Sequence, residues 1–127
     1  MASLEEKHLA LLRAKNFGVV ATAGANGRLQ TSVVWVDTDG EHVVFNTRTD
    51  RAKGRNLAAS PRASISVWDV DDPLRYVEFE GPVELTEDGA DEHIHELSRK
   101  YDGVDFHTPE NRVIVRITPE RVLDHNV

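Results

Sequence analysis

Six short runs of alternating apolar and polar residues restrict the folds open to this chain. The runs cover residues 17–23, 28–36, 41–47, 62–70, 74–86 and 112–118. Successive side chains of a strand point to opposite faces, so a period of two predicts strands rather than helices. The dipeptides Asn26-Gly27 and Asp39-Gly40 are typical of tight turns between strands. We therefore expect antiparallel strands joined largely by hairpins.

Three further segments have the signals of short helices. Residues 3–14 begin with a capping box, Ser3-Leu4-Glu5-Glu6, and residues 89–101 form another helical stretch. Asp50 is expected to cap a short helix that runs toward Ala59. Six strands and three short helices predict a mainly β fold, a small closed or nearly closed antiparallel barrel in one domain.

Two features shape the expected barrel. Gly81-Pro82 lies inside the run 74–86 and predicts a bend or bulge in one long strand rather than its end. Side chains fill the interior of so small a barrel. A large cofactor is therefore expected on the outer face or in a cleft between two barrels.

Positive charge is concentrated in one part of an acidic chain. From Thr47 to Arg62 there are five Arg or Lys and one Asp, which is a net charge of +4. The rest of the chain has ten Arg or Lys and 21 Asp or Glu, which is a net charge of −11. The segment follows an expected strand and starts an expected helix, so cations and backbone N–H groups converge there. A phosphate site and an ordinary solvated helix start are both compatible with this pattern.

Composition excludes several classes of function. The 127 residues contain no Cys, which excludes thiolate catalysis and Cys-ligated metals. A net charge of −7 argues against nucleic-acid binding, which needs a broad basic face. An acidic N-terminus and the lack of a long apolar run give no support to a signal peptide or membrane span. We expect a cytoplasmic protein.

Four sequence motifs occur along the predicted order of strands and helices. They are Arg51-Ala52-Lys53-Gly54-Arg55-Asn56-Leu57, Ser60-Pro61-Arg62-Ala63, Arg112-Val113-Ile114-Val115-Arg116-Ile117 and Arg121-Val122-Leu123. Over nearly the whole chain they resemble the pyridoxamine 5′-phosphate oxidase-like superfamily, whose fold is a six-stranded split β-barrel. The first motif resembles the branch of small reductases that use the deazaflavin coenzyme F420, rather than the FMN-dependent vitamin B6 oxidases. Those oxidases are longer and carry a second basic cluster, which this chain lacks.

The resemblance implies a set of cofactor-binding residues. Arg51 and Lys53 would hold the cofactor phosphate, with Arg55 and Asn56 near the same anion or its tail. The planar guanidinium group of Arg can donate two parallel hydrogen bonds to a phosphate, and the compact ammonium charge of Lys attracts it.

The resemblance also implies which strands contact the rest of the cofactor. Ser32 and the backbone of Val33 and Val34 would bond the polar edge of the tricyclic ring. Asn46 and Thr47 would flank its ribityl chain.

The family builds this site from two protomers, so the resemblance implies a homodimer. Trp68 would then close over the cofactor of the partner subunit, although ordinary barrel packing explains a Trp at this position equally well. Apolar residues on both faces of Val33-Val34-Trp35-Val36 also indicate that a partner covers one face.

Other chemistries have weaker support. His93 and His95 lie two residues apart on an expected helix, so they point in different directions and cannot share one metal ion. A solvated helix face explains both, and His8 is expected to pack rather than bind a metal. The sequence has no nucleophile elbow, and Asp71-Asp72 lies in a Pro turn.

We therefore expect an F420-dependent oxidoreductase that transfers hydride to or from a small or planar conjugated substrate. The cofactor supplies the hydride, and His107, Tyr76 or solvent supplies the proton. An FMN-binding oxidoreductase of the same fold and a non-catalytic flavin- or tetrapyrrole-binding protein are the alternatives.

Overall fold

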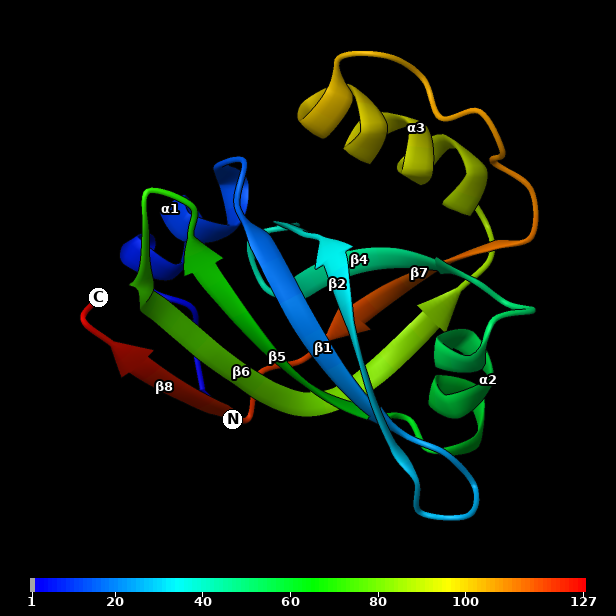
Figure 1. Ribbon diagram of the computed structural model, residues 1–127, viewed down its shortest axis with the longest axis horizontal. Coiled ribbons are helices and arrows are strands. Elements are labelled where there is room, and N and C mark those ends of the chain that lie inside the picture. Colours follow the sequence, from blue (N-terminus) through cyan, green and yellow to red (C-terminus); the bar gives the residue numbers. More distant parts are fainter. Residues whose placement is uncertain (1) are drawn as a thin grey trace.

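Antiparallel strands form one curled sheet in the computed structural model of this chain, which describes residues 2–127 (Figure 1). The order across the sheet is β2-β1-β5-β6-β7-β4-β3, and β8 pairs with β6. The strands are β1 (Phe17–Ala23), β2 (Leu29–Trp35), β3 (Asp37–Thr38), β4 (Val43–Arg48), β5 (Arg62–Asp69), β6 (Asp72–Thr86), β7 (Arg112–Ile117) and β8 (Arg121–His125). The prediction of a mainly β, antiparallel split barrel is confirmed.

All six predicted runs form strands, and two short strands add to them. The first of these, β3, pairs with the start of β4. The other, β8, pairs with residues 76–80 of β6, on the edge of β6 that β5 leaves open. Because β8 is mostly exposed and short, its sequence lacks the alternation that marks a half-buried strand.

The long strand β6 changes partners at its predicted bend. Residues 72–82 pair with β5, and residues 83–86 pair with β7. A Cβ atom on Gly81 would lie 1.9 Å from the carbonyl oxygen of Thr118, so only glycine allows this close approach. The prediction that Gly81-Pro82 bends the strand without ending it is confirmed.

Three helices pack on the sheet, namely α1 (Glu6–Arg13), α2 (Ala52–Ala59) and α3 (Ala90–Asp102). Helix α3 begins one residue later than predicted, and the other two begin after N-cap residues that differ from those predicted. The N-cap of α1 is Glu5, whose backbone N–H donates to His8 Nδ1 over 3.0 Å, so the capping box expected from Ser3 is wrong. The N-cap of α2 is Arg51 rather than Asp50, because both carboxylate oxygens of Asp50 accept hydrogen bonds from Arg48.

The inside of the curled sheet is the hydrophobic core. Its largest fully buried side chains include Phe45, Phe79, Leu12, Leu57 and Ile65. Helix α2 contacts β1 and β4, and α3 contacts β4 and β7, so the C-terminal end of β4 lies between these two helices (Figure 1). None of the described helices has the length and apolar character needed to cross a membrane.

Candidate functional site

An apolar cavity of about 230 Å³ lies where β2, β4 and α3 meet; we call it the apolar chamber. Its apolar lining consists of Phe17, Val33, Val34, Trp35, Ile94, Leu97 and Phe106. At one end the lining becomes polar, with Asn46, Lys53 and Arg112. The chamber therefore suits a flat apolar group that carries a polar or charged extension.

A second cavity, of about 310 Å³, adjoins the chamber and is strongly basic; we call it the cationic cradle. It is lined by Asn46, Thr47, Arg48, Arg51, Lys53, Phe106, His107, Thr108 and Arg112. The two cavities share Asn46, Lys53, Phe106 and Arg112. Together they form one site with an apolar half and a cationic half.

Close packing of α2 against the end of β4 brings the cations together. A Cβ atom on Gly54 would lie 2.2 Å from the carbonyl oxygen of Arg48, so glycine is required for this approach. Arg51 and Lys53 lie just before Gly54 and thus reach the cradle. Arg112 enters from β7, where it lies directly opposite Arg48 of β4.

Three of the four Arg and Lys side chains that line the cradle form no salt bridge within the part of the chain that the structure describes. Arg48 is paired with Asp50 at 2.7 Å, but within residues 2–127 Arg51, Lys53 and Arg112 form no salt bridge. Burial, followed by the charges of Arg51 and Arg112, lowers the pKa of Lys53. Burial, Arg48 and Arg51 likewise lower the pKa of Arg112, while the charges of Glu110 and Asp50 act in the opposite direction. An anion in the cradle would offset this repulsion.

Two residues that line both cavities each have a buried polar side-chain atom without a hydrogen-bond partner. The atoms are Asn46 Oδ1 and Arg112 Nε, and no other such side-chain atom occurs in the part of the chain that the structure describes. Buried polar groups are nearly always hydrogen-bonded, so an unpartnered acceptor and an unpartnered donor on two residues that line both cavities favour a polar ligand beside them. The residues present fit a ligand whose polar linker joins an apolar ring to an anion.

Aromatic packing fixes the wall of the apolar chamber. The Trp35 indole stacks on the Tyr101 ring, with centroids 5.3 Å apart and planes 6° from parallel, and meets Phe106 edge-on at 6.1 Å. The Tyr101 hydroxyl donates to the carbonyl oxygen of Asn16, and burial raises the pKa of Tyr101 to about 12. Arg112 lies over the Phe106 ring at 4.6 Å. The wall is therefore held before any ligand binds.

The structure brings together six of the ten residues that the sequence implied for a cofactor. Those that line the site are Val33, Val34, Asn46, Thr47, Arg51 and Lys53. The other four, which line neither cavity, are Ser32, Arg55, Asn56 and Trp68.

The four remaining residues have other surroundings. Arg55 Nη1 donates to the backbone carbonyl of Asp50, and Asn56 Nδ2 donates to Thr22 Oγ1 over 3.1 Å. Ser32 lies one residue before the lining segment of β2. Trp68 packs against Phe17, with ring centroids 6.3 Å apart.

Sequence reasoning missed Arg112 and Phe106 as site residues. The sequence places Arg112 at the start of a strand and in a motif shared with the family, but its position opposite Arg48 depends on a pairing of β4 with β7 that no local signal reveals. Of the two proton donors considered, His107 lines the cradle, whereas Tyr76 stacks on His125 with centroids 4.2 Å apart.

His93 and His95 are half-buried, so the expectation of a solvated helix face is wrong. Asn46 Nδ2 lies 3.0 Å from His93 Nδ1, and the Phe106 N–H donates to His95 Nδ1 over 3.0 Å. Both side chains have partners because α3 packs on β4 and β7 and the loop after α3 folds back over it. The two imidazoles contact different groups, as their spacing predicted.

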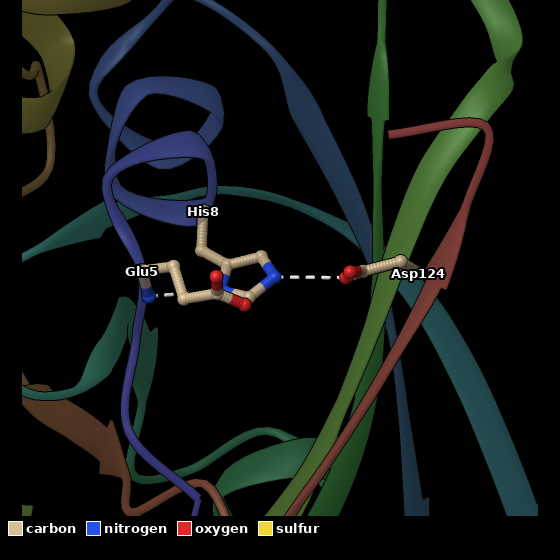
Figure 2. A group of neighbouring side chains, drawn as sticks. All are labelled: Glu5, His8 and Asp124. Carbon is tan, nitrogen blue, oxygen red and sulfur yellow. Dashed lines mark hydrogen bonds and ion pairs between the residues drawn. The ribbon is translucent and has the colours of Figure 1, made fainter.

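Glu5, His8 and Asp124, which line neither cavity, form a compact group (Figure 2). His8 is only 2% exposed, accepts at Nδ1 from the Glu5 N–H, and donates from Nε2 to Asp124 Oδ1 over 2.8 Å. Lys7 binds the second oxygen of Asp124 at 2.7 Å. Both nitrogens of His8 are therefore used in joining α1 to β8, as expected of a packing residue.

Comparisons with known proteins agree with this fold. A pyridoxine/pyridoxamine 5′-phosphate oxidase of Methylibium petroleiphilum is 38% identical over 86 residues, which are 67% of this chain and 40% of that protein. This chain thus spans well under half of that relative's length.

Two solved structures are similar over nearly the whole chain. One, described as an F420 reductase, is 32% identical with a TM-score of 0.83, covering 94% of this chain and 98% of its own. The other, a conserved hypothetical protein of Mycobacterium tuberculosis, is 25% identical with a TM-score of 0.79, covering 98% and 87%. The family model described as pyridoxamine 5′-phosphate oxidase matches residues 4–126. This chain therefore belongs to the pyridoxamine 5′-phosphate oxidase family.

Proposed function

We propose that this protein is an oxidoreductase that binds coenzyme F420 and transfers hydride between it and a small or planar conjugated substrate. The observation that carries the proposal is the cationic cradle, with its unpaired Arg51, Lys53 and Arg112 among residues 2–127, next to a flat apolar chamber. F420 has a matching order of parts: a tricyclic ring, a hydroxylated chain and a phosphodiester. The similarity to a solved structure described as an F420 reductase supports the choice of cofactor.

Each part of the site has a role in this proposal. Arg51, Lys53 and Arg112 hold the phosphate, since the guanidinium groups of the two Arg and the half-buried ammonium of Lys53 form charge-assisted hydrogen bonds with it. Asn46 and Thr47 flank the hydroxylated chain at the border of the cavities.

The ring is proposed to lie in the apolar chamber along β2. The backbone of Val33 and Val34, with Ser32, would bond its polar edge, while Trp35 and Phe106 form the wall. When bound, the deazaflavin supplies the hydride, and the protein supplies position and electrostatics. His107, which lines the cradle, is proposed to pass the proton to or from the substrate.

A homodimer is the second part of the proposal. Val33 lines the chamber yet is 63% exposed, and Leu29 at the start of the same strand is 80% exposed. Strand β2 pairs only with β1 among the described strands, so its other edge is open. A second copy that covers this edge would close the chamber, and Trp68 of that copy is proposed to lie over the cofactor. The acidic tail of F420 would meet Arg48 or Arg55.

FMN is the second candidate, because its ring, hydroxylated chain and phosphate also match the site. The proposal is tested by following the oxidation of reduced F420 with a panel of quinones, enones and tetrapyrroles. We expect turnover only when an acceptor is supplied. Tight cofactor binding without turnover on any acceptor would instead indicate a non-catalytic binding protein.

A further inference from the structure

The amide of Asn46 is held in one orientation by two neighbours. Asn46 is 8% exposed, and its Nδ2 lies 3.0 Å from the carbonyl oxygen of Ala90 and 3.0 Å from His93 Nδ1. A carbonyl oxygen only accepts, so the atom beside Ala90 must be the amide nitrogen. Both amide hydrogens are then used, and the buried Oδ1 has no hydrogen-bond partner among the described residues, while Asn46 itself lines both cavities.

The same geometry fixes the tautomer of His93. An amide NH₂ group only donates hydrogen bonds, so His93 Nδ1 must be the unprotonated nitrogen that accepts from it. The proton of the neutral imidazole ring therefore lies on Nε2. A proton added to Nδ1 would face the Asn46 N–H group. The Asn46 amide would then have to turn. Its nitrogen would point away from Ala90, and the nitrogen and oxygen of the amide would exchange places.

The surroundings of His93 keep it neutral. Burial is the main cause that lowers the pKa of His93, and the charge of Arg116 adds to it, while Asp37 acts in the opposite direction. The cavity on this side of α3 is lined by Asp37, Asp39, Glu96 and Arg116 as its charged groups. Arg116 Nε lies 3.5 Å from an oxygen of Asp39, and Lys100 Nζ lies 3.3 Å from one of Asp37.

We infer that His93 is a positioning residue that holds Asn46 so that Oδ1 faces the ligand as an acceptor. The ligand group at this point is therefore a hydrogen-bond donor. Resting on the proposed function, this donor is a hydroxyl of the chain that joins the ring of F420 or FMN to its phosphate. A ligand with only acceptors at this position would leave Asn46 Oδ1 unpaired.

The first test needs no cofactor. In the ¹⁵N-labelled protein, nitrogen chemical shifts distinguish a bare ring nitrogen from a protonated one. At neutral pH we expect a bare Nδ1 and a protonated Nε2 for His93, and we expect the Asn46 side-chain NH₂ signals to move as His93 titrates on acidification. A proton on Nδ1 at neutral pH would overturn the inference, as would Asn46 side-chain signals whose chemical shifts stay constant while His93 titrates.

The second test uses ligand affinity for F420 and FMN. His93→Leu removes the acceptor, whereas His93→Gln keeps an oxygen that accepts from the Asn46 amide. We expect His93→Leu to raise the dissociation constant of whichever cofactor binds about tenfold, the effect of one lost hydrogen bond, and His93→Gln to restore most of the affinity. Equal affinity in the two variants would contradict the inference.

The two tests separate this inference from the function on which it rests. A protein that binds neither cofactor would overturn the proposed function, and the NMR measurement would still decide the arrangement of His93 and Asn46. The pH profile of cofactor affinity adds a further check, because affinity should fall as His93 becomes protonated. In His93→Gln this acid-side fall should disappear.

Discussion

Arg48 and Arg112 lie directly opposite each other on the antiparallel strands β4 and β7, and both line the cationic cradle. Like charges at opposite positions of a strand pair are destabilising. Asp50 partners Arg48, but within residues 2–127 no carboxylate forms a salt bridge with Arg112. The free protein therefore holds a repulsive pair that a bound anion would relieve.

Inorganic pyrophosphate should stabilise the free protein against heat. An anion that binds only the folded state raises the melting temperature, and here it also reduces the repulsion among the neighbouring cations of the cradle. Differential scanning fluorimetry should show a larger rise with pyrophosphate than with sodium chloride at equal ionic strength. In Arg112→Gln we expect a smaller rise from pyrophosphate; an equal rise in this variant and the unmodified protein would contradict the assignment.

Loss of Arg51 and Lys53 should weaken cofactor binding strongly. Each charge-assisted hydrogen bond contributes about 1.5–3 kcal/mol, so Arg51→Ala with Lys53→Ala should raise the dissociation constant at least about tenfold. Fluorescence titration measures this change, and circular dichroism checks that the variant is folded. Arg121→Ala, which removes an exposed cation of β8, serves as the control and should bind normally. Unchanged affinity in the folded double variant would refute the assignment.

Cofactor affinity should fall as the pH rises toward the alkaline range. The pKa of Lys53 is lowered by burial, then by Arg51 and Arg112, so Lys53 loses its proton below the ordinary lysine pKa. The neutral amine no longer attracts a phosphate. The same shift means that the charged Lys53 costs stability, so the free protein should gain stability as the pH rises through the pKa of folded Lys53. Lys53→Arg should flatten both profiles, which isothermal titration and urea unfolding measure.

The proposed dimer predicts that one substitution on β2 affects both assembly and binding. Val33→Glu places a charge on the exposed side chain at the open edge of the chamber. Light scattering should show a dimer for the unmodified protein and a monomer with weakened cofactor binding for the variant. Leu74→Glu, at an apolar residue of β6 that is also largely exposed and lines neither cavity, is the control. An unmodified protein that is monomeric and binds the cofactor fully would exclude the dimer.

Local sequence signals predicted the strands well, because alternation and turn residues act over short distances. They failed for Asp50, which matches the preferred N-cap types but whose carboxylate binds Arg48 instead. They also failed for Arg112, because its place in the cradle depends on the register between two strands far apart in sequence. His93 shows the same limit, since its contact with Asn46 follows from the packing of α3 on the sheet.

The relative affinity for F420 and FMN tests the central claim most directly. Both cofactors carry a phosphate, so the cradle alone does not separate them, and the difference must come from the ring contacts along β2 and from the acidic tail of F420. In parallel titrations under identical conditions, we predict that F420 binds at least about tenfold more tightly, a difference of about 1.4 kcal/mol. Tight binding of FMN with no measurable affinity for F420 would contradict the account.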